Sequence, residues 1–196
     1  MSKEKTVELP GAEQISSELN RVNYHIRFRN VLRSTIYIMI VVAAVAVLIA
    51  VLLMPVIRIY GSSMTPTLNE GEIVVSLKSR NLKSGDIVGV YYGSKLLIKR
   101  CAAFAQDWVD IDKEGNVYVN GELLDEPYLT EKAFGECNIE LPYQVPDNSV
   151  FVLGDKRATS IDSRNSSVGC IDLEDVVGKI VFRIWPLNTL GIIGNE

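Results

Sequence analysis

Histidine is almost absent from this chain of 196 residues, and His25 is its only copy. His25 lies ahead of a long apolar run, whereas most of the polar sequence follows that run. If the run crosses a membrane, no histidine remains on the far side to serve as the base of a serine or cysteine nucleophile. A Ser/His/Asp or Cys/His hydrolase is therefore excluded in that orientation, and a nucleophile there needs another base.

Cysteine is also scarce, and its spacing does not suit a metal. The three cysteines are Cys101, Cys137 and Cys170. No pair has the Cys-x-x-Cys spacing of a metal site, and an odd number leaves at least one thiol unpaired within one chain. We therefore expect no metal and no cofactor, while the sequence leaves the disulfide state and the oligomeric state open.

Most of the chain has no excess of positive charge. The formal net charge of the whole chain is -4. Residues 1–33 carry six basic and four acidic residues, net +2, and the remainder carries 14 basic and 20 acidic residues, net -6. An acidic domain is a poor binder of nucleic acid. We therefore expect no nucleic-acid partner, and any contact of this domain with a membrane has to be apolar.

What the chain does have is an apolar run of 24 uncharged residues, 34–57, bracketed by Arg33 and Arg58. A helix of this length spans about 36 Å, more than the roughly 30 Å of a hydrocarbon core. A buried core helix and a cleaved signal peptide are the alternatives, but cleaved signals have shorter apolar cores and shorter leaders. The run therefore predicts an uncleaved anchor in a lipid bilayer.

The charges beside the run predict its orientation. Four arginines lie shortly before it, and Arg58 is the only basic residue for some distance after it. The positive-inside rule then keeps the N-terminus in the cytoplasm. We expect a single-pass protein of the cell membrane with three parts: a cytoplasmic tail (1–33) with a mobile start, a transmembrane helix (34–57) and an extracytoplasmic domain (58–196).

After Tyr60 the chain breaks into short runs of β-branched and aromatic residues separated by Gly, Asn and Asp, which predicts a mainly β domain. The clearest predicted strands are residues 72–77, 86–92, 95–100, 116–119, 149–154 and 179–185. Two hairpin turns are expected in the middle of the domain. One is at residues 114–116, and the other is at Asn120-Gly121, a pair that suits a type I′ turn.

Lysine can replace histidine as a base, because burial lowers its pKa toward the working range. Lys99 is a candidate, since two-residue alternation places it on one face with Leu97, away from Ile98 and Arg100. A strand-end lysine that reaches solvent is the alternative. Ser63, in the Gly-rich segment GSSMTPTLNEG (61–71), is a candidate nucleophile, although serine is also an ordinary turn residue.

Several motifs resemble those of the type I signal peptidases, including the Gram-positive-like short forms. Residues 63–68, Ser-Met-Thr-Pro-Thr-Leu, resemble the family motif Ser-Met-x-Pro-Thr-Leu, and they begin six residues after the apolar run. The other similar segments, in family order, are residues 85–88 (GDIV), Lys99-Arg100, residues 117–129 (VYVNGELLDEPYL), residues 154–164 (GDKRATSIDSR) and residues 182–191 (FRIWPLNTLG).

This resemblance implies a membrane-bound serine endopeptidase with a signal-peptidase-like β-barrel or β-sheet domain. It would remove N-terminal signal peptides from secreted preproteins, with Ser63 as nucleophile, Lys99 as general base and Ser160 orienting Lys99. Structural support of the site by ion pairs is implied for Asp155, Arg157, Asp162 and Arg164. Binding of the substrate is implied for Ile59, Gly61, Met64, Leu68, Leu97 and Ile98, whose bulky apolar members favour small residues before the cut, as in Ala-x-Ala; core packing is the alternative role.

The chain departs from the family pattern at three places. Gly61 stands where some members have a serine that helps bind the oxyanion, which leaves the backbone N–H of Ser63 for that role. Lys156 replaces the usual Asn of Gly-Asp-Asn-Arg, and residues 101–107 replace a Val-x-Gly-x-Pro-Gly-Asp-like turn. The serine and the lysine are both retained.

Two other interpretations compete with this one. A cytosolic SOS-repressor-like autoprotease shares Ser/Lys chemistry, but it needs a DNA-binding segment and no anchor. A non-catalytic signal-peptidase-like pilus assembly factor typically lacks the serine and lysine pair, whereas a dedicated pilus factor of the same fold acts on one substrate. Retention of Ser63 and Lys99 favours an active peptidase.

Overall fold

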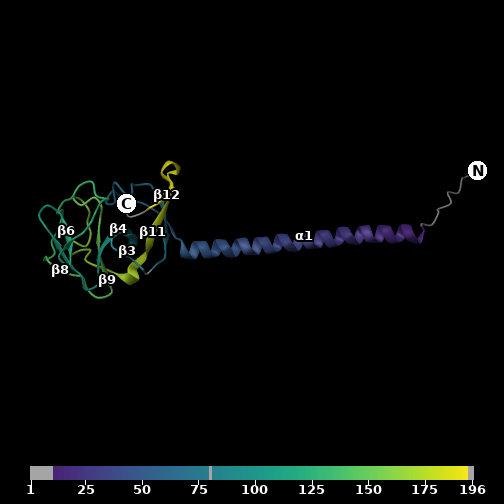
Figure 1. Ribbon diagram of the computed structural model, residues 1–196, viewed down its shortest axis with the longest axis horizontal. Helices are drawn as coiled ribbons and strands as arrows, with labels where there is room; N and C mark the ends of the chain where they lie inside the picture. Colours follow the sequence, from purple (N-terminus) through teal and green to yellow (C-terminus); the bar gives the residue numbers. More distant parts are fainter. Residues whose placement is uncertain (1–10, 80, 194–196) are drawn as a thin grey trace, which may run out of the picture. The chain divides into compact units, whose positions relative to one another are not determined.

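The computed structural model describes residues 11–79 and 81–193. Residues 1–10 of the predicted cytoplasmic tail and the last three residues of the predicted domain lie outside the described residues. The chain divides into two compact units, residues 1–50 and residues 51–196. The described part of the first unit is most of one helix, and the second is a β domain (Figure 1).

The helix α1 (Ala12–Leu53) is longer than the predicted span and ends earlier. It begins directly after Gly11, because residues 12–33 are rich in good helix formers and contain no Gly or Pro. It ends at Leu53 and not at residue 57, because Pro55 has no N–H and residues 56–58 pair with another strand. The predicted helix end was therefore wrong by four residues.

α1 is the one helix in the described part of the chain that is long and apolar enough to cross a membrane. Its most apolar window of 18 residues has a mean hydropathy of 3.2. No residue of α1 is buried, so the alternative of a core helix finds no support.

The larger sheet of the domain has eight strands in the order β1-β2-β11-β3-β4-β9-β10, with β12 paired to β11. All its pairs are antiparallel. The central strands β11, β3, β4 and β9 lie side by side in Figure 1. The strand bounds are β1 (Val56–Arg58), β2 (Ile73–Leu77), β3 (Ile87–Tyr92), β4 (Lys95–Phe104), β9 (Ser149–Leu153), β10 (Ile171–Asp172), β11 (Val176–Trp185) and β12 (Gly191–Ile192).

The smaller sheet has four antiparallel strands in the order β7-β6-β5-β8. Their bounds are β5 (Trp108–Ile111), β6 (Val117–Val119), β7 (Glu122–Leu123) and β8 (Tyr143–Gln144). Two short 3-10 helices, η1 (Leu173–Asp175) and η2 (Leu187–Thr189), complete the described elements. The predicted fold class, mainly β with one N-terminal apolar helix, is confirmed.

Both predicted hairpins are present. Residues 112–116 connect β5 to β6, and Asn120-Gly121 connects β6 to β7. Asn120 and Gly121 have φ values of 53° and 83°, as a type I′ turn requires of both central residues. The sequence therefore predicted this meander correctly from its turn residues.

Three apolar clusters form the core. One contains Met64 and Leu68 from the loop after β1, packed against residues of β1, β2 and β11. A second contains Val88, Val90 and Cys101 together with residues of β9. The third joins the small sheet to β4 and β9. Residues of β4 contribute to all three regions, so this strand is packed on both faces.

Candidate active site

Ser63 lies in the loop between β1 and β2, and its side chain is half-buried. Met64 and Leu68, two residues of the same loop, pack into the apolar core and are 2% and 0% exposed. The N–H of Leu68 donates to the carbonyl of Met64 at 2.9 Å, which closes a turn immediately after the serine. Ser63 is therefore half-buried, and the residue that follows it, Met64, is fixed in the apolar core.

Lys99 lies on β4 and is 3% exposed, so the alternative of a solvent-reaching lysine is contradicted. Its Nζ donates a hydrogen bond to Ser160 Oγ at 2.9 Å. Burial lowers the pKa of Lys99 below its usual 10.5. Among its charged neighbours Asp162 and Asp155 raise this pKa and Arg164 lowers it, but the loss of hydration has the larger effect.

One cavity of about 550 Å³ has both Ser63 and Lys99 in its wall. It is lined by residues 56–61, Ser63, Met64 and residues 95–99, which come from β1, the loop after β1 and the start of β4. We call it the acyl cavity. Its wall combines the Ser63 hydroxyl and the buried Lys99 amine with mostly apolar side chains, and Arg58, Tyr60 and Lys95 also line it.

Most of the residues predicted to bind substrate line this acyl cavity, namely Ile59, Gly61, Met64, Leu97 and Ile98. Leu68 does not. It is completely buried in the cluster that contains Ile57 and Val74, beneath the loop that carries Ser63. Its predicted place in the pocket is therefore corrected to core packing, and Ile59 and Met64 belong to both the core and the cavity wall.

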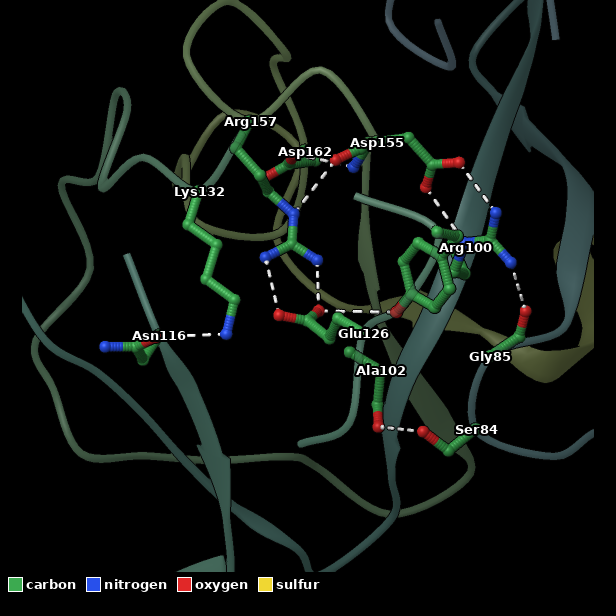
Figure 2. A network of polar contacts seen from close by, with 12 residues as sticks. Ser84, Gly85, Arg100, Ala102, Asn116, Glu126, Lys132, Asp155, Arg157 and Asp162 are labelled. Atoms are coloured by element: carbon green, nitrogen blue, oxygen red, sulfur yellow. Dashed lines mark hydrogen bonds and ion pairs between the residues drawn. The ribbon is translucent and has the colours of Figure 1, made fainter. Parts of the chain in front are cut away.

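Asp155 forms a two-point ion pair with Arg100, drawn with two dashed lines in Figure 2. The Arg100 Nη2 to Asp155 Oδ2 distance is 2.6 Å, and both side chains are 1% exposed. Arg100 Nη1 also donates to the Gly85 carbonyl at 2.7 Å, and Thr67 Oγ1 donates to Asp155 Oδ2 at 2.5 Å. Asp155 thereby connects the Ser63 loop to β4, the strand that carries Lys99.

Two arginines of the segment that follows β9 form two more buried ion pairs. Arg157 pairs with Glu126 through two guanidinium nitrogens, as Figure 2 shows. Arg164 pairs with Asp162 at 2.9 Å and donates to the Phe134 carbonyl at 2.7 Å. Asp162 in turn accepts from the Gly154 N–H at 2.9 Å. The four charged residues implied by the family motif are thus all buried and all paired.

Gly154 permits a close approach between the Ser63 loop and Ser160. A Cβ at this position would lie 2.1 Å from Ser160 Oγ and 2.8 Å from the Ser63 carbonyl oxygen. The next residue but one, Lys156, donates its backbone N–H to that same carbonyl at 2.9 Å. Only a residue without a side chain fits at residue 154, because the backbone here touches the Ser63 loop and Ser160, the hydrogen-bond partner of Lys99.

Sequence reasoning missed several residues that hold the site. Arg100 was noted only as part of a motif, yet its guanidinium carbon lies 3.6 Å from the centre of the Tyr128 ring. Glu126 was not singled out, and neither was Arg183, which donates to the Thr67 carbonyl at 2.6 Å and pairs with Glu72 at 2.9 Å. A signal was available for Arg100, since an arginine inside a buried strand needs a carboxylate partner.

All three cysteines are free thiols. Burial raises the pKa of Cys101 to about 12 and that of Cys170 to about 11. Such thiols are poor nucleophiles. In the described residues no group of three or more His, Cys, Asp or Glu side chains is arranged to hold a metal ion.

Comparisons with known proteins show what this chain is similar to. A family model described as "Signal peptidase, peptidase S26" matches residues 32–185. Signal peptidase I of Bacillus licheniformis is 33% identical over 175 residues, covering 83% of this chain and 93% of that protein. Signal peptidase IB of Staphylococcus aureus (strain COL) is 36% identical over 151 residues, covering 66% of this chain and 77% of that protein.

A crystal structure of a signal peptidase I from Enterococcus faecalis V583 is also similar. It is 24% identical, covers 53% of this chain and 98% of that chain, and has a TM-score of 0.44. The family model alone matches well over half of the residues, and it does so across the Ser63 loop, β4 and the segment after β9. This chain therefore belongs to the signal peptidase family, peptidase S26.

Proposed function

We propose that this chain removes N-terminal signal peptides from preproteins, with Ser63 as the nucleophile and Lys99 as the general base. The observation that carries the proposal is that Ser63 and the buried Lys99 line the same cavity. Membership of a peptidase family supports the reaction class. Retention of both residues disfavours a non-catalytic assembly factor, which was the alternative.

In the first half of the reaction, the Ser63 hydroxyl oxygen attacks the scissile carbonyl while Lys99 Nζ takes the hydroxyl proton. The tetrahedral oxyanion is stabilised by the backbone N–H of Ser63, because Gly61 has no side chain to contribute. Collapse of this intermediate breaks the C–N bond, and the protonated Lys99 returns the proton to the leaving amine. The signal peptide is then held as an ester on Ser63.

In the second half, water attacks the ester carbonyl and Lys99 takes the proton of that water. Collapse breaks the bond to Ser63 Oγ, which recovers its proton from Lys99. The signal peptide leaves as a carboxylic acid, which loses its proton to bulk water. Both halves need Lys99 to be neutral when it starts. Burial supports this because it disfavours the ammonium form.

Ser160 acts as a positioning residue for Lys99. Its Oγ accepts the hydrogen bond from Lys99 Nζ at 2.9 Å, and Ser160 is 1% exposed. A fixed acceptor on one side of the amine limits the directions in which its lone pair can point. The ion pairs of Asp155, Arg157, Asp162 and Arg164 support the same geometry by fixing the segment that carries Ser160.

Selection of the cleavage site follows from the acyl cavity. β1 is an edge strand, so an extended signal peptide can add to it through main-chain hydrogen bonds. The side chain before the cut then enters the cavity between Ile59, Met64, Leu97 and Ile98. These bulky apolar walls favour Ala or Gly, consistent with an Ala-x-Ala type preference.

We further propose that α1 anchors the enzyme in the bilayer, with the N-terminus in the cytoplasm and the domain from residue 58 onward outside. The apolar run and the arginines before it support this orientation. Anchoring places enzyme and substrate in the same membrane, which raises their effective concentration.

The test is cleavage of a preprotein by the full-length chain in detergent or liposomes. We expect Ser63→Ala and Lys99→Ala each to reduce cleavage by at least about 1,000-fold, because residues that act as a unit fail together. Ser62→Ala is the matched control, since it removes a neighbouring exposed hydroxyl and should retain activity. Wild-type activity in the Ser63→Ala variant would overturn the assignment of the nucleophile.

A further inference from the structure

A second, smaller cavity lies beside the Ser63 loop, on the side that follows the serine. Its volume is about 170 Å³, less than a third of that of the acyl cavity. Its lining includes Thr65 and Pro66 from the loop, Glu131 and Ala133 from the segment before β8, and Lys156. We call it the lysine cavity.

The lysine cavity contains two charged side chains that are unpaired. Asp155 and Arg157 also line it, but they are neutralised by Arg100 and Glu126. Within residues 11–79 and 81–193, neither Lys156 nor Glu131 forms an ion pair or a side-chain hydrogen bond. Lys156 is exposed, so its ammonium group is available to a ligand.

The backbone fixes Lys156 next to the reacting serine. Its N–H donates to the Ser63 carbonyl at 2.9 Å, and its carbonyl accepts from the Ser160 N–H at 3.0 Å. Glu131 belongs to a different segment and has no such bond to the Ser63 loop. Of the two residues with unpaired charges, Lys156 is therefore the one whose backbone is held at a fixed position relative to Ser63, where the scissile bond is cut.

We propose that the lysine cavity receives the first residues of the mature protein and that Lys156 selects for an acidic side chain there. A substrate chain that is cut at Ser63 must extend away from this serine in two directions. The residues before the cut occupy the acyl cavity, whose wall includes Ser63 and Met64, and the residues after it pass toward the lysine cavity, whose wall includes the next two residues of the loop, Thr65 and Pro66. This inference rests on the proposed function, and it adds a preference for charge after the cut.

The expected size of the effect is modest, because an exposed ion pair contributes about 0.2 to 1 kcal/mol. For substrates that differ only at the first or second residue after the cut, we expect kcat/KM to be about 1.4- to fivefold higher with Asp than with Asn. Lys at the same position should be worse than Asn. The Asp to Asn ratio should fall toward one as the salt concentration rises, because salt screens exposed charges.

The experiment compares these three substrates with the full-length wild type and with Lys156→Glu. We expect Lys156→Glu to invert the order, so that Lys becomes better than Asp. Lys113→Glu is the matched control, because it makes the same change of charge at an exposed residue in the turn between β5 and β6. It should leave the order unchanged.

A second variant keeps the proposal testable if Lys156→Glu fails to fold. Lys156→Gln removes the charge alone and should bring the Asp to Asn ratio close to one. An unchanged ratio in Lys156→Gln would overturn the proposal, as would an equal change in Lys113→Glu. Failure of the wild type to cleave any preprotein would instead overturn the proposed function, so the two results are distinguishable.

Discussion

The eight-stranded and four-stranded sheets of the domain differ in what they bury. The side chains around the Ser63 loop include three buried arginines with buried carboxylate partners, and the buried Lys99, which donates to Ser160. No buried polar or charged residue belongs to β5, β6, β7 or β8, whose buried side chains are valines and isoleucine. The region around the site therefore has buried ion pairs in addition to its apolar core, whereas the strands of the small sheet bury apolar side chains alone.

This difference distinguishes the interactions that stabilise the fold from those that fix the geometry of the site. Burial of apolar side chains stabilises a fold directly, whereas a buried ion pair rarely stabilises more than an apolar replacement of the same shape. Removal of one partner is nevertheless severe, because it leaves a buried charge without compensation. The buried charges thus fix the geometry of the site, while the small sheet contributes apolar core. The following predictions, ordered by expected effect, test this contrast.

The largest effect is expected from Asp155→Asn. It leaves the guanidinium of Arg100, which is 1% exposed, without an anionic partner. We expect a loss of about 3 to 5 kcal/mol in the free energy of unfolding, together with lower activity, because the Ser63 loop also loses its ionic acceptor. Urea denaturation of the full chain in detergent measures the first quantity and preprotein cleavage the second.

The control for that change is Asp110→Asn in the small sheet, an exposed carboxylate on β5. It should alter stability by less than about 0.5 kcal/mol, as most surface substitutions do. If the two variants were equally stable, the Arg100 pair would not be important for the fold of the site.

A smaller loss is expected from Val109→Ala, which removes buried methyl groups from the core of the small sheet. We expect a loss of about 2 kcal/mol in stability, from lost burial and the cavity that remains. The kcat of the folded fraction should stay within about twofold of the wild type, since the substitution lies outside the site. A large fall in kcat at a temperature where the variant is fully folded would contradict the separation of the two regions.

The pH dependence of cleavage tests the environment of Lys99. Because burial lowers its pKa and the neutral form is the base, the rate should rise about tenfold per pH unit below that pKa and level off above it. The plateau should be reached below the usual lysine value of 10.5. A profile that stays flat from neutral to alkaline pH would argue against a lysine base.

The same pKa has a consequence for stability. The unfolded chain binds a proton at Lys99 at pH values where the folded chain does not, so the free energy of unfolding rises with pH between the folded and unfolded pKa values. This slope should disappear in Lys99→Met, which has no titrating group. Denaturation at several pH values measures it.

Much of the fold followed from local sequence. The apolar run predicted the helix, and β-branched runs predicted six strands, each of which is present with small shifts at its ends. Asn120-Gly121 predicted a turn because few residues accept a positive φ. The error at the end of the helix arose because residues 56 and 57 are as apolar as the helix before them. Only the tertiary structure shows that these residues belong to a strand, because they pair with β2.

The sequence by itself predicted the family, a candidate nucleophile and a candidate base, and its single histidine, placed before the apolar run, favoured a lysine base. These depend on short motifs and on the order of segments along the chain. Only the tertiary structure decided that Lys99 is buried, that Leu68 belongs to the core and that Arg100 and Glu126 complete the ion pairs. Burial and pairing are set by groups from distant segments, since Arg100 and Asp155 are 55 residues apart and meet only after β4 and β9 pair.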